Sequence, residues 1–260
     1  MDFKVPTMAE MMAKGEQPDI LFWVGCAGSF DERAQKITKD IAKILNHVGM
    51  KYAILGTEES CTGDPAKRAG NEFLFQMQAM SNIELLNAYE VKKIVTACPH
   101  CFNTLKNEYP ELGGHYEVIH HTQLIQDLIN EGKLAASNGE SFKGKRITYH
   151  DPCYLGRYNQ VYNAPRKVIK NALKNDVVEM SMNKQSSFCC GAGGGRMFME
   201  EHIGKRINHE RTEQAILTNA KTIATACPFC MTMMNDGVKD KGLGESIEVK
   251  DIAELVADRL

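Results

Sequence analysis

Residues 94–101 read Ile-Val-Thr-Ala-Cys-Pro-His-Cys, and residues 223–230 read Ile-Ala-Thr-Ala-Cys-Pro-Phe-Cys. The two stretches lie 129 residues apart and differ only at Val95/Ala224 and His100/Phe229. In each, a short apolar run ends at Cys-Pro-x-Cys. Proline is tolerated in the first turn of a helix, so the pattern predicts a buried strand that leads through a cysteine loop into a helix. Such self-similarity indicates a duplicated unit.

The cysteines follow the same repeat. Cys61 and Cys190 are also 129 apart, and Cys26 and Cys153 are 127 apart. At the constant offset Ser60 stands opposite Cys189, so the first set has one thiol fewer. Buried structural cysteines would keep no such register, and we therefore expect a thiolate site that is built twice. The two sets are Cys26, Cys61, Cys98 and Cys101, and then Cys153, Cys189, Cys190, Cys227 and Cys230.

Length and composition limit the function classes. A chain of 260 residues can hold one large domain or two fused domains, and 43% hydrophobic with 25% charged residues is ordinary for a soluble globular protein. The 31 basic and 33 acidic residues give a net charge of −2 without a basic stripe, which argues against a nucleic-acid partner.

The sequence shows neither a positively charged leader followed by an apolar run nor an uncharged stretch of membrane-spanning length. Cysteines at this density without an export signal indicate metal ligands rather than disulfides. We therefore expect a cytoplasmic protein without a transmembrane segment of its own, which reaches the inner face of the membrane only through partners.

Alternating strands and helices predict an α/β fold with two tandem, pseudo-symmetric Rossmann-like halves. The sheets should be parallel, with the cysteines at the carboxyl ends of the strands. We expect an N-terminal arm at 1–19, a first half at 20–131, a linker at 132–145 and a second half at 146–260. Strands are expected at 20–25, 52–55, 93–97, 116–119, 147–150, 177–180, 222–226 and 247–249. Helices are expected at 31–49, 66–89, from 122 onward, at 164–173 and at 197–217.

Three interpretations of the thiols compete. Buried structural cysteine is common in general but does not explain the register. Zinc is favoured by paired Cys-x-x-Cys units that lie close together, yet the second set has five thiols where zinc takes four. Iron–sulfur clusters are bound by thiolates and tolerate widely spaced ligands, and we favour this interpretation.

The second set resembles a known signature. Cys153, the doublet Cys189-Cys190 before Gly191, and the pair Cys227/Cys230 are similar to the CCG domain of the B-type and D-type catalytic subunits of heterodisulfide reductase. The resemblance covers the chain from about residue 20 to the end. It implies a non-cubane [4Fe–4S] cluster, held here by Cys153, Cys189, Cys190, Cys227 and Cys230.

The first half departs from that signature, because Ser60-Cys61-Thr62-Gly63 lacks the cysteine doublet. A serine oxygen is a harder and less acidic donor than a thiolate and is rarely an iron ligand. The four thiols Cys26, Cys61, Cys98 and Cys101 suffice for a conventional cubane [4Fe–4S] cluster. The alternative is a non-cubane cluster in which Ser60 or water replaces the fifth thiol.

Other residues have weaker claims. His150 precedes Cys153 at a strand end and could donate a hydrogen bond or a proton to a substrate, although a histidine satisfied by backbone groups is an equal alternative. We count Cys189, Cys190 and His150 as the catalytic candidates. At the offset of 129, His120 and His121 correspond to Val249 and Lys250, and we expect helix capping near Thr122. The glycine run 191–195 is followed by Arg196, which does not fit a dinucleotide loop.

Two functions remain. In the first, the chain is an oxidoreductase subunit, like heterodisulfide reductase, whose non-cubane cluster performs two-electron disulfide chemistry and is fed by the second cluster. In the second, it is a pure electron-transfer subunit of a quinone-linked dehydrogenase complex for lactate, glycolate or glycerol-3-phosphate. Both require a ferredoxin-like iron–sulfur subunit, and a flavoprotein or a membrane quinone-reactive subunit, as partners.

Overall fold

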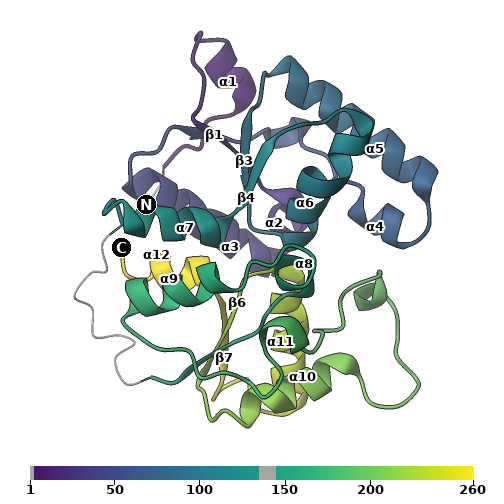
Figure 1. Cartoon of the computed structure of the whole chain (residues 1–260), viewed down its shortest axis with the longest axis vertical. Helices are drawn as coiled ribbons and strands as arrows, with labels where there is room; N and C mark the ends of the chain where they lie inside the picture. Colours follow the sequence, from purple (N-terminus) through teal and green to yellow (C-terminus); the bar gives the residue numbers. More distant parts are fainter. Residues whose placement is uncertain (1–2, 135–144) are drawn as a thin grey trace.

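The computed structural model describes residues 3–134 and 145–260 and shows an α/β protein with two parallel sheets (Figure 1). The first sheet has the order β2-β1-β3-β4, and the second has the order β5-β6-β7. A single parallel bridge between Val177 and Ile147 occupies the place beside β5 that β2 occupies beside β1. The strands are β1(Ile20–Trp23), β2(Tyr52–Ala53), β3(Lys93–Thr96), β4(Glu117–His120), β5(Ile147–Tyr149), β6(Thr222–Thr225) and β7(Glu248–Asp251). The expected pair of Rossmann-like halves is confirmed.

Helices connect the strands and cover both sheets. In the first half they are α1(Met8–Met12), α2(Gly25–Phe30), α3(Glu32–His47), α4(Asp64–Arg68), α5(Glu72–Ala88), α6(Pro99–Asn103) and α7(His121–Asn130). In the second half they are α8(Cys153–Gly156), α9(Asn163–Leu173), α10(Ile207–Ile216), α11(Pro228–Asp240) and α12(Ile252–Ala257). None of the helices in the described ranges is long and apolar enough to cross a membrane.

The sequence accounts for these elements locally. In α3, Ile37, Ile41 and Ile44 recur at helical spacing and are buried, while the Asp31 side chain caps the helix by accepting a hydrogen bond from the Ala34 backbone N–H at 2.7 Å. All four residues of β1 are buried, as expected for a strand of a parallel sheet that is covered on both faces.

Four sequence expectations require correction. The helix expected at 66–89 is interrupted at Gly70, whose φ of +82° lies in the left-handed region, so α4 and α5 are separate. The strand expected at 177–180 consists only of the Val177 bridge. The helix expected at 197–217 begins at Ile207, because 196–198 form a 3₁₀ turn. Cys26 lies within α2 rather than in a strand-end loop.

The arm packs on the first half. Met8 and Met11 are buried in its core, and Thr7 forms a parallel bridge with Ile54 beyond the end of β2. Most of the expected linker, 135–144, lies outside the described residues. The division into an arm, two halves and a linker therefore stays a proposal.

Matching helices of the two halves pack in reciprocal pairs. Helix α3 packs on α12 and α9 packs on α7, while α2 packs on α11 and α8 packs on α6. Figure 1 shows α3 and α7 of the first half facing α9 and α12 of the second. Since α3 and α9 follow the first strand of each half and α7 and α12 follow the last, the reciprocity indicates pseudo-twofold symmetry. The buried apolar residues form one core that is continuous through both halves.

Buried polar contacts hold the two halves together. The Nε2 atom of His121, in α7, lies 2.9 Å from Oδ1 of Asp251, and both side chains are buried. The same Oδ1 atom caps α12 by accepting from the Ala253 backbone N–H at 2.8 Å. Glu254 is fully buried and pairs with Arg33 at 2.7 Å and Lys36 at 3.1 Å, both in α3.

Replacing Asp251 by alanine should destabilise the protein by about 2–4 kcal/mol, because it removes a helix cap and leaves the buried His121 nitrogen unpaired. Asp31→Ala is the matched control, because Asp31 is an exposed cap without a partner in the other half, and should cost about 1 kcal/mol. Urea unfolding of the two variants measures the difference. Equal losses would contradict the role of Asp251 between the halves.

Burial in the α3–α12 contact and the nearby Glu254 carboxylate raise the pKa of Asp40 to about 6 from its usual 3.8. A raised carboxyl pKa means that the folded protein holds a proton more tightly, so its contribution to stability is lost as pH rises from about 4 to about 6. Asp40→Asn should therefore be more stable than the parent above pH 6, with the difference vanishing below pH 4. Unfolding free energies measured across this range would contradict the argument if the difference were independent of pH.

Candidate functional site

The two Cys-Pro-x-Cys motifs form the turns that the sequence predicts. Helix α6 begins at Pro99 with Cys98 as its N-cap, and α11 begins at Pro228 with Cys227 as its N-cap. Each cysteine follows a strand of a parallel sheet, so both motifs lie at carboxyl strand ends. The unpaired N–H groups of a helix N-terminus stabilise negative charge there, which favours thiolates.

The four thiols of the first set converge. Cys26 in α2 and Cys61 ahead of α4 are hydrogen-bonded to each other, and Cys98 is hydrogen-bonded to Cys101. The hydrogen bond from Cys26, together with one from the Gly63 backbone N–H at 3.5 Å, lowers the pKa of Cys61 to about 7. Cys26, Cys61 and Cys101 line one cavity together. This donor set suits a thiolate-bound cluster.

The five thiols of the second set also converge. Cys153, at the start of α8, is hydrogen-bonded to Cys189, and Cys230 Sγ lies 3.2 Å from Cys190 Sγ. Hydrogen bonds from Cys153 and Cys190 hold the pKa of Cys189 far below its usual range. Cys190, Cys227 and Cys230 are buried, whereas Cys153 and Cys189 are partly exposed. All nine cysteines of the chain are free thiols.

The two sets share a wall. Hydrogen bonds from Cys101 and Cys227 hold the pKa of Cys98 below its usual range, so Cys98 and Cys227 meet across the interface between the halves. Beside them, the His100 ring stacks on Tyr154 with a centroid distance of 4.1 Å and meets Phe229 edge-on at 5.3 Å. His100 therefore shapes the boundary between the two sets, and its Nδ1 atom is held by Asp64 at 2.8 Å.

The contacts correct the residue equivalence that the constant offset suggests. Cys61 meets Cys26 as Cys189 meets Cys153, and the Thr62 hydroxyl lies 3.9 Å from Cys101 Sγ, as Cys190 lies beside Cys230. Gly63 (φ +88°) and Gly191 (φ +94°) each donate a backbone N–H to the cysteine two residues before them. Cys-Thr-Gly therefore superimposes on Cys-Cys-Gly, and Thr62, not Ser60, replaces the fifth thiol.

Ser60 has a different contact. Its hydroxyl donates to Asn82 Oδ1 at 2.8 Å, and Asn82 in turn donates to the Cys61 backbone carbonyl at 2.9 Å. The nearby Glu59 carboxylate accepts from the backbone N–H groups of Val24 and Gly25 at 3.0 and 2.5 Å, and burial raises its pKa to about 7. These side chains hold the backbone that carries Cys26 and Cys61.

His150 is buried beside the second set. One of its ring nitrogens lies within 4.8 Å of the sulfurs of Cys190 and Cys230. Nδ1 accepts a hydrogen bond from Nε of Arg211 at 2.9 Å, while Nε2 is buried without a partner. Burial and the Arg211 charge lower the pKa of His150 to about 3. At neutral pH His150 is therefore an uncharged ring with its proton on Nε2.

Asp151 organises the loop ahead of the cysteine doublet. Its two carboxylate oxygens each accept from the guanidinium of Arg166 at 2.8 Å, and Oδ2 also accepts from the Lys184 backbone N–H. The Ser187 hydroxyl donates to the Asp151 backbone carbonyl at 3.1 Å. These contacts fix the approach of the chain to Cys189.

The equivalence expected for the other histidines is also wrong. His120 pairs in register with Thr96 as Asp251 pairs with Thr225, so its counterpart is Asp251 rather than Val249. The cap expected near Thr122 is His120 itself, whose Nδ1 atom accepts from the Thr122 backbone N–H. Arg196, after the glycine run, is exposed and pairs with Glu201 at 3.1 Å.

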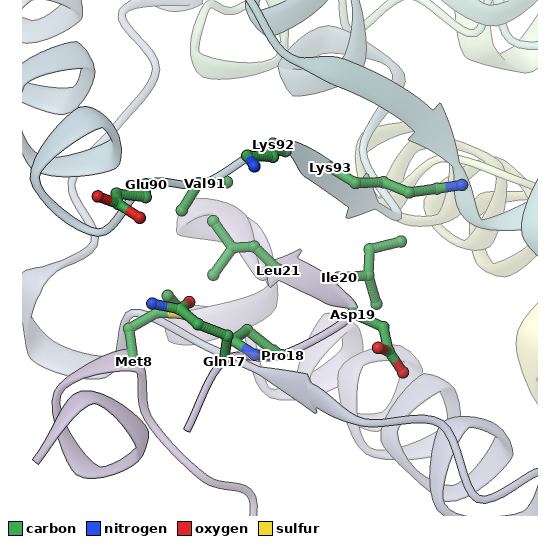
Figure 2. A pocket seen from close by; sticks show the side chains of 10 residues that line it. All are labelled: Met8, Gln17, Pro18, Asp19, Ile20, Leu21, Glu90, Val91, Lys92 and Lys93. Atoms are coloured by element: carbon green, nitrogen blue, oxygen red, sulfur yellow. The ribbon is translucent and has the colours of Figure 1, made fainter. Parts of the chain in front are cut away.

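Two cavities differ in their relation to the thiols. One of about 360 Å³ lies between the halves, is lined mainly by apolar atoms and reaches Cys26, Phe198 and Phe229. The other, of about 240 Å³, lies at the opposite, amino-terminal ends of β1 and β3, where Asp19, Glu90 and Lys92 line it (Figure 2). The second cavity contains no cysteine or histidine among its lining residues and is not part of the site.

Comparison with known families agrees with this geometry. The cysteine-rich domain named CCG matches residues 20–106 and 147–235. The chain belongs to the CCG cysteine-rich domain family. Both matched regions begin with the first strand of a half and include its Cys-Pro-x-Cys motif.

Relatives within this family have redox names. The probable iron-sulfur-binding oxidoreductase FadF of Bacillus subtilis is 47% identical over 98% of this chain and 36% of its own length. The EtfAB:quinone oxidoreductase of Syntrophomonas wolfei is 46% identical over 93% of this chain and 34% of its own. The D-type subunit of the dihydromethanophenazine:CoB–CoM heterodisulfide reductase of Methanosarcina barkeri is 38% identical over 94% and 60%. The CCG chain thus spans about a third of the first two relatives.

Sequence reasoning identified all nine converging cysteines of this CCG chain but missed Thr62, Asn82 and Arg211. The signal for Thr62 was available, since aligning Gly63 with Gly191 places Cys-Thr-Gly on Cys-Cys-Gly. Arg211 had no comparable signal, because the residues that it contacts are distant in sequence.

Gly191→Ala should destabilise the CCG fold by about 1–3 kcal/mol, because a left-handed φ is costly for a residue with a side chain and the added Cβ would lie 3.2 Å from Ile207. Gly193→Ala is the matched control, since Gly193 has an ordinary φ and open space around its Cα. Urea unfolding compares the two. A loss in Gly193→Ala as large as that in Gly191→Ala would be the contradicting result.

Proposed function

We propose that this chain is an iron–sulfur subunit of an oxidoreductase of the heterodisulfide reductase type. In this proposal the five-thiol second site performs the chemistry and the four-thiol first site supplies its electrons. The observation that carries it is the convergence of two unequal thiol sets which meet at Cys98 and Cys227. Thiolates in these numbers suit iron–sulfur clusters, whereas a tetrahedral zinc site would leave one thiol of the second set unused.

The thiol sets support unequal clusters. We assign a non-cubane [4Fe–4S] cluster to Cys153, Cys189, Cys190, Cys227 and Cys230. For the first site we assign a cubane [4Fe–4S] cluster to Cys26, Cys61, Cys98 and Cys101, because Thr62 stands where the fifth thiol would be. Neither threonine nor the Asn82-bound Ser60 offers a thiolate.

The proposed reaction cleaves a disulfide. The S–S bond accepts two electrons and two protons and becomes two thiols, and the cluster supplies one-electron transfer steps at the partly exposed end of the second site. Cys189 and Cys190 hold that end, and the neutral His150 ring donates a hydrogen bond there. Its low pKa makes His150 a poor acid, so we assign the protons to solvent.

The two electrons come from a reduced partner, which we propose is a ferredoxin-like iron–sulfur subunit linked to a flavoprotein or to a membrane quinone-reactive subunit. The proposed location is the cytoplasm, at the inner face of the membrane through those partners. The shared wall at Cys98 and Cys227 supports electron passage between the two sites without an additional cofactor.

A second function is favoured by the identities of the relatives. The chain is 46% identical to a quinone oxidoreductase and 38% identical to a heterodisulfide reductase subunit. In this alternative both sites only relay electrons between a dehydrogenase and a quinone-linked partner, and no disulfide binds at Cys189.

Thiol titration of the anaerobic, oxidised protein separates the two functions. Direct chemistry predicts that a substrate thiol produces a new paramagnetic species that can be assigned to the second site by its loss in Cys190→Ser. An unchanged electron paramagnetic resonance spectrum, in protein that contains the full complement of iron, would instead establish the relay.

Thr62→Cys tests the assignment of unequal sites. It recreates the cysteine doublet before Gly63, so the first-site spectrum should change toward that of the second site, while Thr62→Ser should leave it unchanged. Ser60→Ala should leave about eight irons per chain, the content of two [4Fe–4S] clusters. Loss of about four irons in Ser60→Ala, or an unaltered spectrum in Thr62→Cys, would contradict the assignment.

A further inference from the structure

Arg211 is a buried cation with only neutral hydrogen-bond partners. Its side chain is fully buried. Nε donates to His150 Nδ1 at 2.9 Å, and the Nη atoms donate to the Met182 carbonyl and Gln214 Oε1, both at 2.8 Å, and to Ser187 Oγ at 3.3 Å. Within residues 3–134 and 145–260, no carboxylate lies within 4.0 Å of its guanidinium.

A buried charge without a counter-charge is strongly destabilising. Asp151 is near enough to interact electrostatically with Arg211, but both of its carboxylate oxygens are bound to Arg166. The remaining acidic groups that interact with Arg211 are the thiols of Cys189, Cys190 and Cys230. The second thiol set is therefore the anion that this cation faces.

His150 connects the cation to that set. Because an arginine always donates, Nδ1 of His150 must accept and the ring proton must lie on Nε2. Nε2 is buried without a protein partner, and the ring lies beside Cys190 and Cys230. Arg211 thus fixes the tautomer in which His150 presents an N–H group to the sulfur atoms of the site.

The first half lacks this cation. Asn82 is the counterpart of Arg211, since each lies eight residues before the positive-φ residue, Glu90 or Asn219, that follows its helix. Trp23 stands where His150 stands, and its indole N–H is also buried without a partner. Both sites therefore have a neutral N–H group. Arg68, the nearby arginine of the first half, pairs with Asp64 and Glu108.

We propose that Arg211, by its unpaired charge and through His150, is the positioning residue that gives the second site a higher reduction potential than the first. This inference rests on the proposed function, because it requires a redox cluster on the second thiol set. A positive charge and an N–H donor beside the sulfurs both stabilise the reduced, more negative state. Electrons then pass from the first site to the second, where the substrate is reduced.

The test is a redox titration of the anaerobic protein, followed by electron paramagnetic resonance, in Arg211→Met and in the charge-conserving Arg211→Lys. Arg211→Met should shift the second-site signal to a more negative potential, while Arg211→Lys stays close to the parent. The first-site signal is the internal control and should not move in either variant. His150→Phe should shift the second site in the same direction, and its combination with Arg211→Met should shift it by less than the sum.

Equal shifts in Arg211→Met and Arg211→Lys, or no shift in either, would overturn the inference. Iron analysis decides the case in which a variant fails to load its second site. Loss of that iron from Arg211→Met alone supports a requirement for the charge, and equal loss from both variants indicates packing and overturns it. A parent protein without iron in the second site would instead refute the proposed function.

Discussion

The contact between Cys98 and Cys227 is the constraint on which the rest of the structure depends. Each cysteine caps a helix at the carboxyl end of a central strand, so their meeting requires the two parallel sheets to face each other at that edge. The reciprocal packing of α3 on α12 and of α9 on α7 maintains this arrangement, and the buried His121–Asp251 contact holds it. A two-site redox protein needs this proximity, because electron passage falls off steeply with distance. The fold is therefore organised around the shared wall of two thiol sets.

Duplication produced two similar sites that differ in charge. The second half has a fifth thiol at Cys190 and a buried cation at Arg211, while the first half has Thr62 and Asn82 at the matching positions. A thiolate and a cation that occur together are electrostatically consistent, because each lowers the cost of burying the other. This pairing explains how one half of a symmetric fold can serve as a relay while the other serves as a reacting centre. It also explains why His150 is held neutral, since the adjacent guanidinium opposes a second positive charge.

Local patterns in the sequence predicted most of the fold and the thiol ligands. The strand runs, the helix of residues 31–49 and the Cys-Pro-x-Cys turns depend on neighbouring residues, and the structure confirms them. The offset of 129 failed between Ser60 and Gly63, because a constant offset cannot register a one-residue shift, whereas the two left-handed glycines do. It failed again at His120, where the last strand of each half is displaced by two residues. The Arg211–His150 contact joins a helix to a strand end 61 residues away, so no local pattern could predict it.

Anomalous diffraction at the iron edge from anaerobically grown crystals would test the central claim most directly. The account predicts two separate groups of iron atoms on either side of the Cys98–Cys227 contact. The second group should be bound by five cysteine sulfurs, with Cys189 and Cys190 both included, and the first by four, with Thr62 unbound. Identical coordination of the two groups, or a single zinc ion in place of either, would contradict it.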